Sequence, residues 1–186
     1  MFTIRYKITD EDLKYCRYIR AAKEFDDKKN WIYGQFLMKA NNNEIGFVHD
    51  DLEYDGENLT VWFMNLNKVI LRSGNDKYVT IPISDWDDSW IEFCRINDHS
   101  LMLSEIEAHL MNTNEYVISG ELDKKTVVWS ENVLLENFIN TTLKSTESFL
   151  EEVKCINSVL SDTREIVCLR ELYNCAKTVE SNLYKR

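Results

Sequence analysis

The sequence predicts an α+β fold: mainly an antiparallel sheet, with one helix near residues 58–73 and two C-terminal helices. Two observations predict this class. Up to about residue 129, apolar and polar residues alternate in short runs, which is the period of a half-buried strand. Beyond that point the apolar residues recur every three to four positions, which is the period of a helix. We expect one domain over residues 1–186, with residues 131–186 as its helical part.

Six short runs have the alternation or the composition of strands: residues 2–8, 31–38, 44–48, 78–83, 90–96 and 101–106. The three Asn residues at 41–43 tolerate a left-handed backbone, so they predict a hairpin between the second and third runs. Asn97 and Asp98 predict a turn between the last two runs. Residues 117–119 and 126–129 are expected to form a further hairpin.

The clearest helix of the first half covers residues 58–72. Six of its apolar residues fall on one stripe: Leu59, Trp62, Phe63, Leu66, Val69 and Ile70. Gly74 follows the last turn, as is common at a helix C-terminus. A shorter helix is expected over about residues 10–24, because Thr9 and the acids that follow it are typical of a helix start.

The two C-terminal helices are predicted from their caps and their apolar spacing. Trp129 and Ser130 have the pattern of a hydrophobic staple and an N-cap, and they predict a helix over about residues 133–159. Ser161 is expected to begin a second helix that reaches Tyr184. Each helix has one apolar face, so each must pack on the sheet or on the other helix.

The composition bounds the class of protein and its compartment. Hydrophobic residues make up 44% of the chain, which is typical of a globular domain and argues against disorder. Five Cys without a C-x-x-C pair and without a secretion signal predict free thiols in a reducing compartment. No apolar run reaches the roughly 18 residues of a membrane helix, so we expect a cytoplasmic protein without a membrane segment.

Charge is distributed unevenly along a chain whose formal net charge is −10. Residues 40–67 hold six acids and no Lys or Arg, and residues 78–123 hold ten acids and one base, Arg95. An acidic surface repels nucleic-acid phosphates, so we expect no nucleic-acid binding. Such a surface attracts a basic protein and speeds the encounter. The alternative explanation is a solvated coat that keeps the chain soluble.

The stretch HDDLEYDGENL, residues 49–59, resembles half of a calcium loop because its carboxylates alternate and a Gly follows. An EF-hand loop that starts at Asp51 has Trp62 at its twelfth position, which must supply a bidentate carboxylate. We therefore expect no calcium site. Residues 55–58 lie beside the positive end of the dipole of the helix that follows, where carboxylates are stabilised. This explanation does not extend to Asp50, Asp51 and Glu53.

A second acidic stretch is SDWDDSW, residues 84–90. In one explanation Trp86 and Trp90 enter the core and the acids cap a turn. In the other the stretch is an interaction surface, because Trp anchors interfaces and carboxylates pair there with Arg or Lys. We predict that the two acidic stretches form the partner-binding surface of the protein: Asp50, Asp51, Glu53, Asp55, Asp85, Trp86, Asp87 and Asp88.

Residue types that carry catalysis or hold metals are scattered. His49, His99 and His109 form no metal-spaced set with one another or with Cys, so we expect neither a metal nor a cofactor. No nucleophile motif and no phosphate-binding glycine loop occurs, and we expect no enzyme. The one route left to acid–base chemistry is a His paired in space with a carboxylate.

Several segments occur in a distinctive order: a Trp-Ile-Tyr-Gly-Gln-Phe strand, an Asn-Glu-Ile-Gly hairpin, an acidic turn, a Leu-x-x-Trp-Phe-x-x-Leu helix, three strands and a long helix. This order resembles that of small bacterial immunity proteins, which guard a cell against its own polymorphic or contact-dependent toxins. The resemblance covers about residues 30–150. It implies a cytoplasmic single-domain inhibitor that binds its toxin tightly and catalyses nothing.

We therefore expect a toxin-neutralising immunity protein that binds and inhibits a cognate, basic toxin domain, since a compact acidic protein suits a basic partner such as a nuclease. Two alternatives stay open. One is a generic protein–protein interaction or regulatory module whose acids only confer solubility. The other is an enzyme with a His–carboxylate site, which a deep pocket holding His99 or His109 beside a carboxylate would favour.

Overall fold

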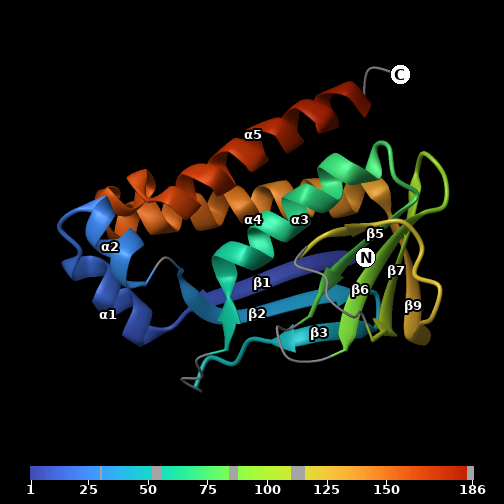
Figure 1. Cartoon of the computed structure of the whole chain (residues 1–186), viewed down its shortest axis with the longest axis horizontal. Coiled ribbons are helices and arrows are strands. Elements are labelled where there is room, and N and C mark those ends of the chain that lie inside the picture. The colour runs from blue at the N-terminus through green and yellow to red at the C-terminus, as the bar shows by residue number, and fades with distance from the viewer. Residues whose placement is uncertain (30, 52–55, 84–87, 110–115, 184–186) are drawn as a thin grey trace.

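The computed structural model describes residues 1–29, 31–51, 56–83, 88–109 and 116–183. Within these ranges the chain has two antiparallel sheets and five α-helices, which confirms the predicted α+β class and the two C-terminal helices. Figure 1 shows the long helices on one side of the sheets and the two short helices together at one end of the molecule. The strands form two sheets where the sequence pattern had suggested one.

The first sheet has four strands: β1 (Phe2–Ile8), β2 (Tyr33–Ala40), β3 (Asn43–Phe47) and β4 (Glu57–Asn58). β2 is central, with β1 along one edge and both β3 and β4 along the other. The predicted hairpin is confirmed, because Asn41 turns the chain between β2 and β3 with a φ of 52°. β4 pairs with Tyr33 and Gly34, so it brings the start of the next helix beside β2.

The second sheet has five strands in the order β8–β5–β6–β7–β9. Their bounds are β5 (Tyr78–Pro82), β6 (Ser89–Arg95), β7 (Ser100–Glu107), β8 (Ile118–Ser119) and β9 (Thr126–Leu134). The turn predicted at Asn97 and Asp98 joins β6 to β7. The predicted hairpin between residues 117–119 and 126–129 is wrong. β8 pairs with β5 and β9 pairs with β7, so they lie at opposite edges of the sheet.

The helical part begins later than predicted, at Leu135 rather than residue 131. β9 stays extended through Leu134 because it pairs with β7 along its length. Ser130, the predicted N-cap, shares a 2.8 Å hydrogen bond between its hydroxyl and that of Ser104 on β7. The indole of Trp129 donates to Glu105 on β7, so neither residue of the expected staple caps the helix.

Three long helices and two short ones complete the fold: α1 (Asp10–Tyr18), α2 (Ala22–Lys28), α3 (Leu59–Ser73), α4 (Leu135–Ile156) and α5 (Arg164–Leu183), with the 3-10 helix η1 (Ser158–Asp162) before α5. The helix expected over residues 10–24 is divided at Ile19, where α1 ends. No helix in the described ranges combines the length with the apolar composition that a bilayer crossing requires.

The predicted apolar stripe of α3 is confirmed, because all six of its residues are buried. Phe63 of α3 stacks on Phe149 of α4 with ring centroids 4.8 Å apart, and Phe36 of β2 stacks on Trp62 at 4.5 Å. Burying these rings removes a large apolar area from water, which is the main stabilising term for the core. Helix α3 follows β4 directly, and another side of this helix forms one wall of a cavity.

Candidate functional site

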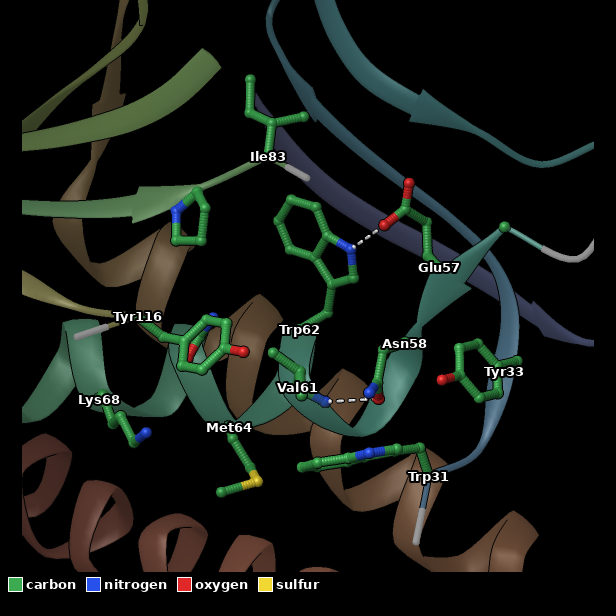
Figure 2. A pocket seen from close by; sticks show the side chains of 13 residues that line it. Trp31, Tyr33, Glu57, Asn58, Val61, Trp62, Met64, Lys68, Ile83 and Tyr116 are labelled. Atoms are coloured by element: carbon green, nitrogen blue, oxygen red, sulfur yellow. Dashed lines mark hydrogen bonds between the residues drawn. The ribbon is translucent and has the colours of Figure 1, made fainter. Parts of the chain in front are cut away.

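A cavity of about 410 Å³ lies where the first turns of α3 approach the ends of β2 and β5. Four aromatic side chains from three separate segments line it: Trp31, Tyr33, Trp62 and Tyr116. Figure 2 shows Tyr116 on one side of the cavity and Trp31 and Tyr33 on the other, with α3 between them. A concave site with aromatic walls and few polar groups is the usual form of a binding pocket.

The first turn of α3 sets the geometry of one wall. Asn58 is the N-cap, and its Oδ1 accepts a hydrogen bond from the backbone of Val61 at 3.1 Å. Glu57 accepts a 2.8 Å hydrogen bond from the indole Nε1 of Trp62 through its Oε2 atom. Because the indole of Trp62 also stacks on the ring of Phe36, it is held in one orientation. The carboxylate of Glu57 is therefore fixed at the cavity.

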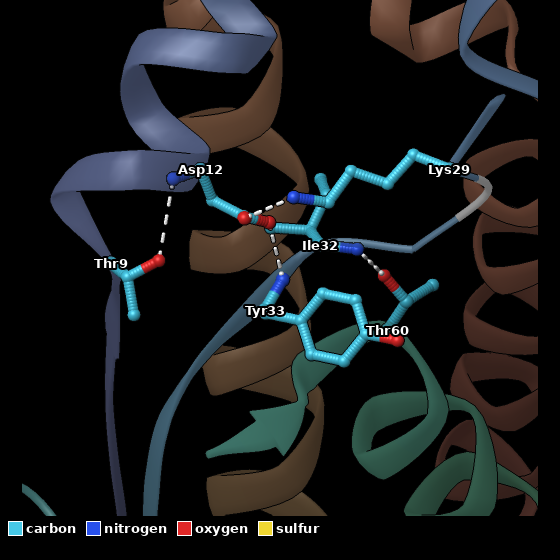
Figure 3. A network of polar contacts seen from close by, with 6 residues as sticks. All are labelled: Thr9, Asp12, Lys29, Ile32, Tyr33 and Thr60. Atoms are coloured by element: carbon cyan, nitrogen blue, oxygen red, sulfur yellow. Dashed lines mark hydrogen bonds and ion pairs between the residues drawn. The ribbon is translucent and has the colours of Figure 1, made fainter. Parts of the chain in front are cut away.

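A buried polar network holds the opposite wall (Figure 3). One oxygen of Asp12, on α1, accepts from the backbone of Tyr33 at 2.7 Å, and the other forms an ion pair with Lys29. The backbone of Ile32 donates to Thr60 Oγ1 at 3.4 Å, and its carbonyl accepts from Leu59 at 3.0 Å. These bonds tie the segment with Trp31 and Tyr33 to both α1 and α3. The aromatic walls are thus preorganised.

Two further polar side chains line the cavity. Asn65 lies two turns into α3, and the residue is 4% exposed. Lys68, one turn further along α3, is the one cation among the described residues that line the cavity.

The sequence-predicted partner-binding residues fall into two groups. Asp50 and Asp51 are exposed, and the backbone carbonyl of Asp50 accepts from Lys7 Nζ at 2.8 Å. Asp88 is exposed as well and contacts His109. The remaining five lie outside the described residues: Glu53, Asp55, Asp85, Trp86 and Asp87.

The described neighbours of the two acidic stretches meet at the same cavity. Gly56, which follows Asp55 in the sequence, lines it, and so does Ile83, which precedes residues 84–87. In the sequence these two neighbours are 27 positions apart. Two residues adjacent to the predicted acids in the sequence therefore line the same cavity, whereas Asp50, Asp51 and Asp88 are not among its lining residues.

A second, shallower hollow holds a His–carboxylate pair. His109 Nδ1 lies 2.9 Å from Asp88 Oδ2, and the two side chains are 68% and 60% exposed. Lys124 and Lys125 line the same hollow. The pair has the contact that the enzyme alternative needs, but it lies at the surface and not in a deep pocket. His99 lies apart from this hollow, and in the described part of the chain no three potential ligands gather to hold a metal ion.

The sequence pattern does not reveal most of the cavity. It predicts a strand for Trp31 and Tyr33, and it places Trp62 on the buried stripe of α3 alone. The available signal was the spacing of Trp31 and Tyr33, because residues two apart in an extended segment share a face. Nothing in the sequence indicates that this face meets Tyr116.

Comparisons with known proteins add nothing to this geometry: no family model, no curated protein and no solved structure matches the chain. Two features of the chain bear on its function: its negative charge and the aromatic cavity that Gly56 and Ile83 help to line.

Proposed function

We propose that this chain is a toxin-neutralising immunity protein, which acts in the cytoplasm by binding and inhibiting a cognate, basic toxin domain. The observation that carries the proposal is the position of Gly56 and Ile83. Both line the preorganised aromatic cavity, and each is adjacent in the sequence to predicted partner-binding acids. Protein interfaces commonly combine aromatic anchors at a central pocket with charged residues at the rim, and the proposed surface would have both parts.

The charge of the chain supports a basic partner. The net charge is −10, and the described members of the first acidic stretch, Asp50 and Asp51, are exposed. Like charges gathered on one surface repel one another, which a binding role explains better than folding does. Opposite charge on the partner would speed association and exclude acidic competitors. The free cysteines suit a reducing compartment, in keeping with a cytoplasmic inhibitor.

A second candidate function, acid–base catalysis, is favoured only by the contact between His109 and Asp88. Both side chains are mainly exposed to water, and the high dielectric constant of water weakens the interaction of such a pair. A catalytic pair is usually strengthened by a low-dielectric environment. Substituting His109 by Ala separates the candidates. The proposed binding function is unaffected by this change, whereas a catalytic function would be lost.

Two variants with the same change in net charge test the proposal. The cavity variant combines Asp50→Asn, Asp51→Asn and Glu57→Gln. The helix variant combines Glu136→Gln, Glu151→Gln and Asp162→Asn, which are exposed residues of α4 and η1 that do not line the cavity.

Each protein is immobilised and used to capture proteins from its native host, with identification by mass spectrometry. We expect the parent and the helix variant to retain the same basic protein. The cavity variant should retain it at least about tenfold less, and salt should weaken retention by the parent. Equal retention by both variants would contradict the proposed function.

A further inference from the structure

We propose that the aromatic cavity receives an arginine side chain of the basic partner, with Glu57 as its carboxylate. The inference rests on the proposed function, because it names the group by which the partner is anchored. Three properties of the cavity support it: the aromatic faces, the free carboxylate oxygen of Glu57 and the separation of the two charges.

The aromatic faces suit a planar cation. Trp31, Tyr33 and Tyr116 line the cavity, and Figure 2 shows their rings around its open space. A guanidinium group stacks on such faces through cation–π attraction, and it is more weakly hydrated than an ammonium group. Lys29 lies 5.5 Å from the ring centroid of Tyr33, but its charge is balanced by its ion pair with Asp12. It therefore offers little opposition to an incoming cation.

The free oxygen of Glu57 matches the donors of arginine. Oε2 of Glu57 accepts from Trp62, and Oε1 makes no hydrogen bond with any described residue. A guanidinium carries five N–H donors in a planar fork, so it can donate to this carboxylate while its face lies on an aromatic ring. Binding would thus give the second oxygen of Glu57 a charged donor.

The two charges of the cavity are well separated. Asn58, next to Glu57, and Lys68 are ten positions apart along α3, which corresponds to about 15 Å of helix rise. Figure 2 shows Glu57 and Lys68 on opposite sides of Trp62 and Val61. The Glu57 end therefore attracts a cation, while Lys68 repels a second one. This arrangement selects a single basic side chain rather than a run of them.

Capped peptides test the assignment without the partner. Each has five residues with glycines around a central arginine, lysine, neutral citrulline or aspartate. The readout is the NMR signal of the indole Nε1–H groups, assigned with Trp→Phe variants. The signals of Trp31 and Trp62 report on the cavity. Those of Trp90 and Trp129, which are bonded elsewhere, serve as internal references.

We expect the arginine peptide to shift the Trp31 and Trp62 signals with saturation in the millimolar range, as suits a small fragment. The citrulline peptide, of nearly the same shape, should bind about tenfold more weakly because it lacks the charge. Glu57→Gln keeps an acceptor for Trp62 and should also lose about tenfold in affinity for the arginine peptide. Lys68→Gln should leave this affinity unchanged or raise it.

Three outcomes would overturn the assignment. They are equal binding of the arginine and citrulline peptides, no shift of the Trp31 and Trp62 signals at about 10 mM peptide, and preferential binding of the aspartate peptide that Lys68→Gln abolishes. The proposed function is tested separately. If the arginine peptide does not bind while capture of a basic protein still depends on the residues changed in the cavity variant, only the arginine assignment is wrong.

Discussion

The indole nitrogen of Trp62 donates a 2.8 Å hydrogen bond to the carboxylate of Glu57, and the same indole stacks on Phe36 of the core. One residue thus belongs to both the core and the cavity. Any motion of the Glu57 carboxylate away from the cavity would leave the indole N–H of a 5% exposed side chain without its partner. The charge at the site is therefore positioned by the packing of the fold.

Substituting Glu57 tests this coupling. Glu57→Leu removes the acceptor and should lower the free energy of unfolding by about 1–3 kcal/mol, the usual cost of an unpaired buried donor. Glu57→Gln retains an oxygen for Trp62 and should cost less than about 1 kcal/mol, since only the charge assistance is lost. Urea unfolding measures both. Equal midpoints for the two variants would show that Glu57 does not hold Trp62.

The ion pair of buried Asp12 with half-buried Lys29 is predicted to hold the wall formed by Trp31 and Tyr33. Asp12→Ala leaves Lys29 and the backbone N–H of Tyr33 without their acceptor, and should cost about 3–5 kcal/mol. The matched control is Glu24→Ala, which breaks the exposed pair of Glu24 with Lys28. That change should leave the unfolding midpoint unchanged. Similar midpoints for the two variants would contradict the role of Asp12.

Gly34 is required where β2 passes between β1 and α3. A Cβ at this position would lie 2.2 Å from the backbone oxygen of Lys7 and 2.5 Å from Leu59 Cδ1. Gly34→Ala should therefore lower stability by about 1–3 kcal/mol, the cost of overpacking. Gly74→Ala is the control, because its Cβ meets only an ordinary contact at 3.8 Å. Thermal unfolding in which Gly34→Ala matches its parent would refute the close approach.

The cysteines should differ in reactivity by position. Burial raises the pKa of the Cys16 thiol from 9.0 to about 11, with a further contribution from the nearby charge of Asp12. Cys155 and Cys175 are exposed. At pH 8 a thiol reagent should modify Cys155 and Cys175 within the native protein and leave Cys16 unmodified, because the thiolate is the reacting form. Peptide mapping checks this; labelling of Cys16 as fast as Cys155 would be inconsistent with its burial.

The same shift predicts a pH dependence of stability. The unfolded thiol loses its proton near pH 9.0, whereas the folded one keeps it until about pH 11. In this interval the native state binds more protons than the unfolded state. The contribution of the Cys16 thiol to the free energy of unfolding is therefore fully present below pH 9, and it is lost as the pH rises towards 11. Between pH 8.5 and 11, the unfolding free energy of a Cys16→Ala variant should decline less steeply than that of the parent.

The parts of the fold predicted correctly from the sequence depend on local patterns. The stripe of α3 and the Asn turn after β2 need no knowledge of distant residues. The start of α4 was predicted wrongly because Trp129 and Ser130 bind partners on β7, 24 and 26 positions away. A local capping signal cannot compete with a strand pairing of that extent.

Uneven charge is visible in the sequence, and it predicts the two acidic stretches as a surface for a basic partner, which stays a prediction. The cavity itself could not be predicted. The cavity is assembled from four segments, and a strand with Trp31 and Tyr33 has the same composition whether its rings enter a core or line a pocket. Their position at a cavity depends on long-range packing against α3 and Tyr116.

The most direct test of the proposed function is a growth assay with the basic protein captured from the host. We predict that this protein arrests growth when expressed alone, and that co-expression of the parent chain or of the helix variant restores growth. The cavity variant, at the same cellular level and with the same net charge, should fail to restore it. Full restoration by the cavity variant, or a captured protein that leaves growth unaffected, would contradict a toxin-neutralising role for this site.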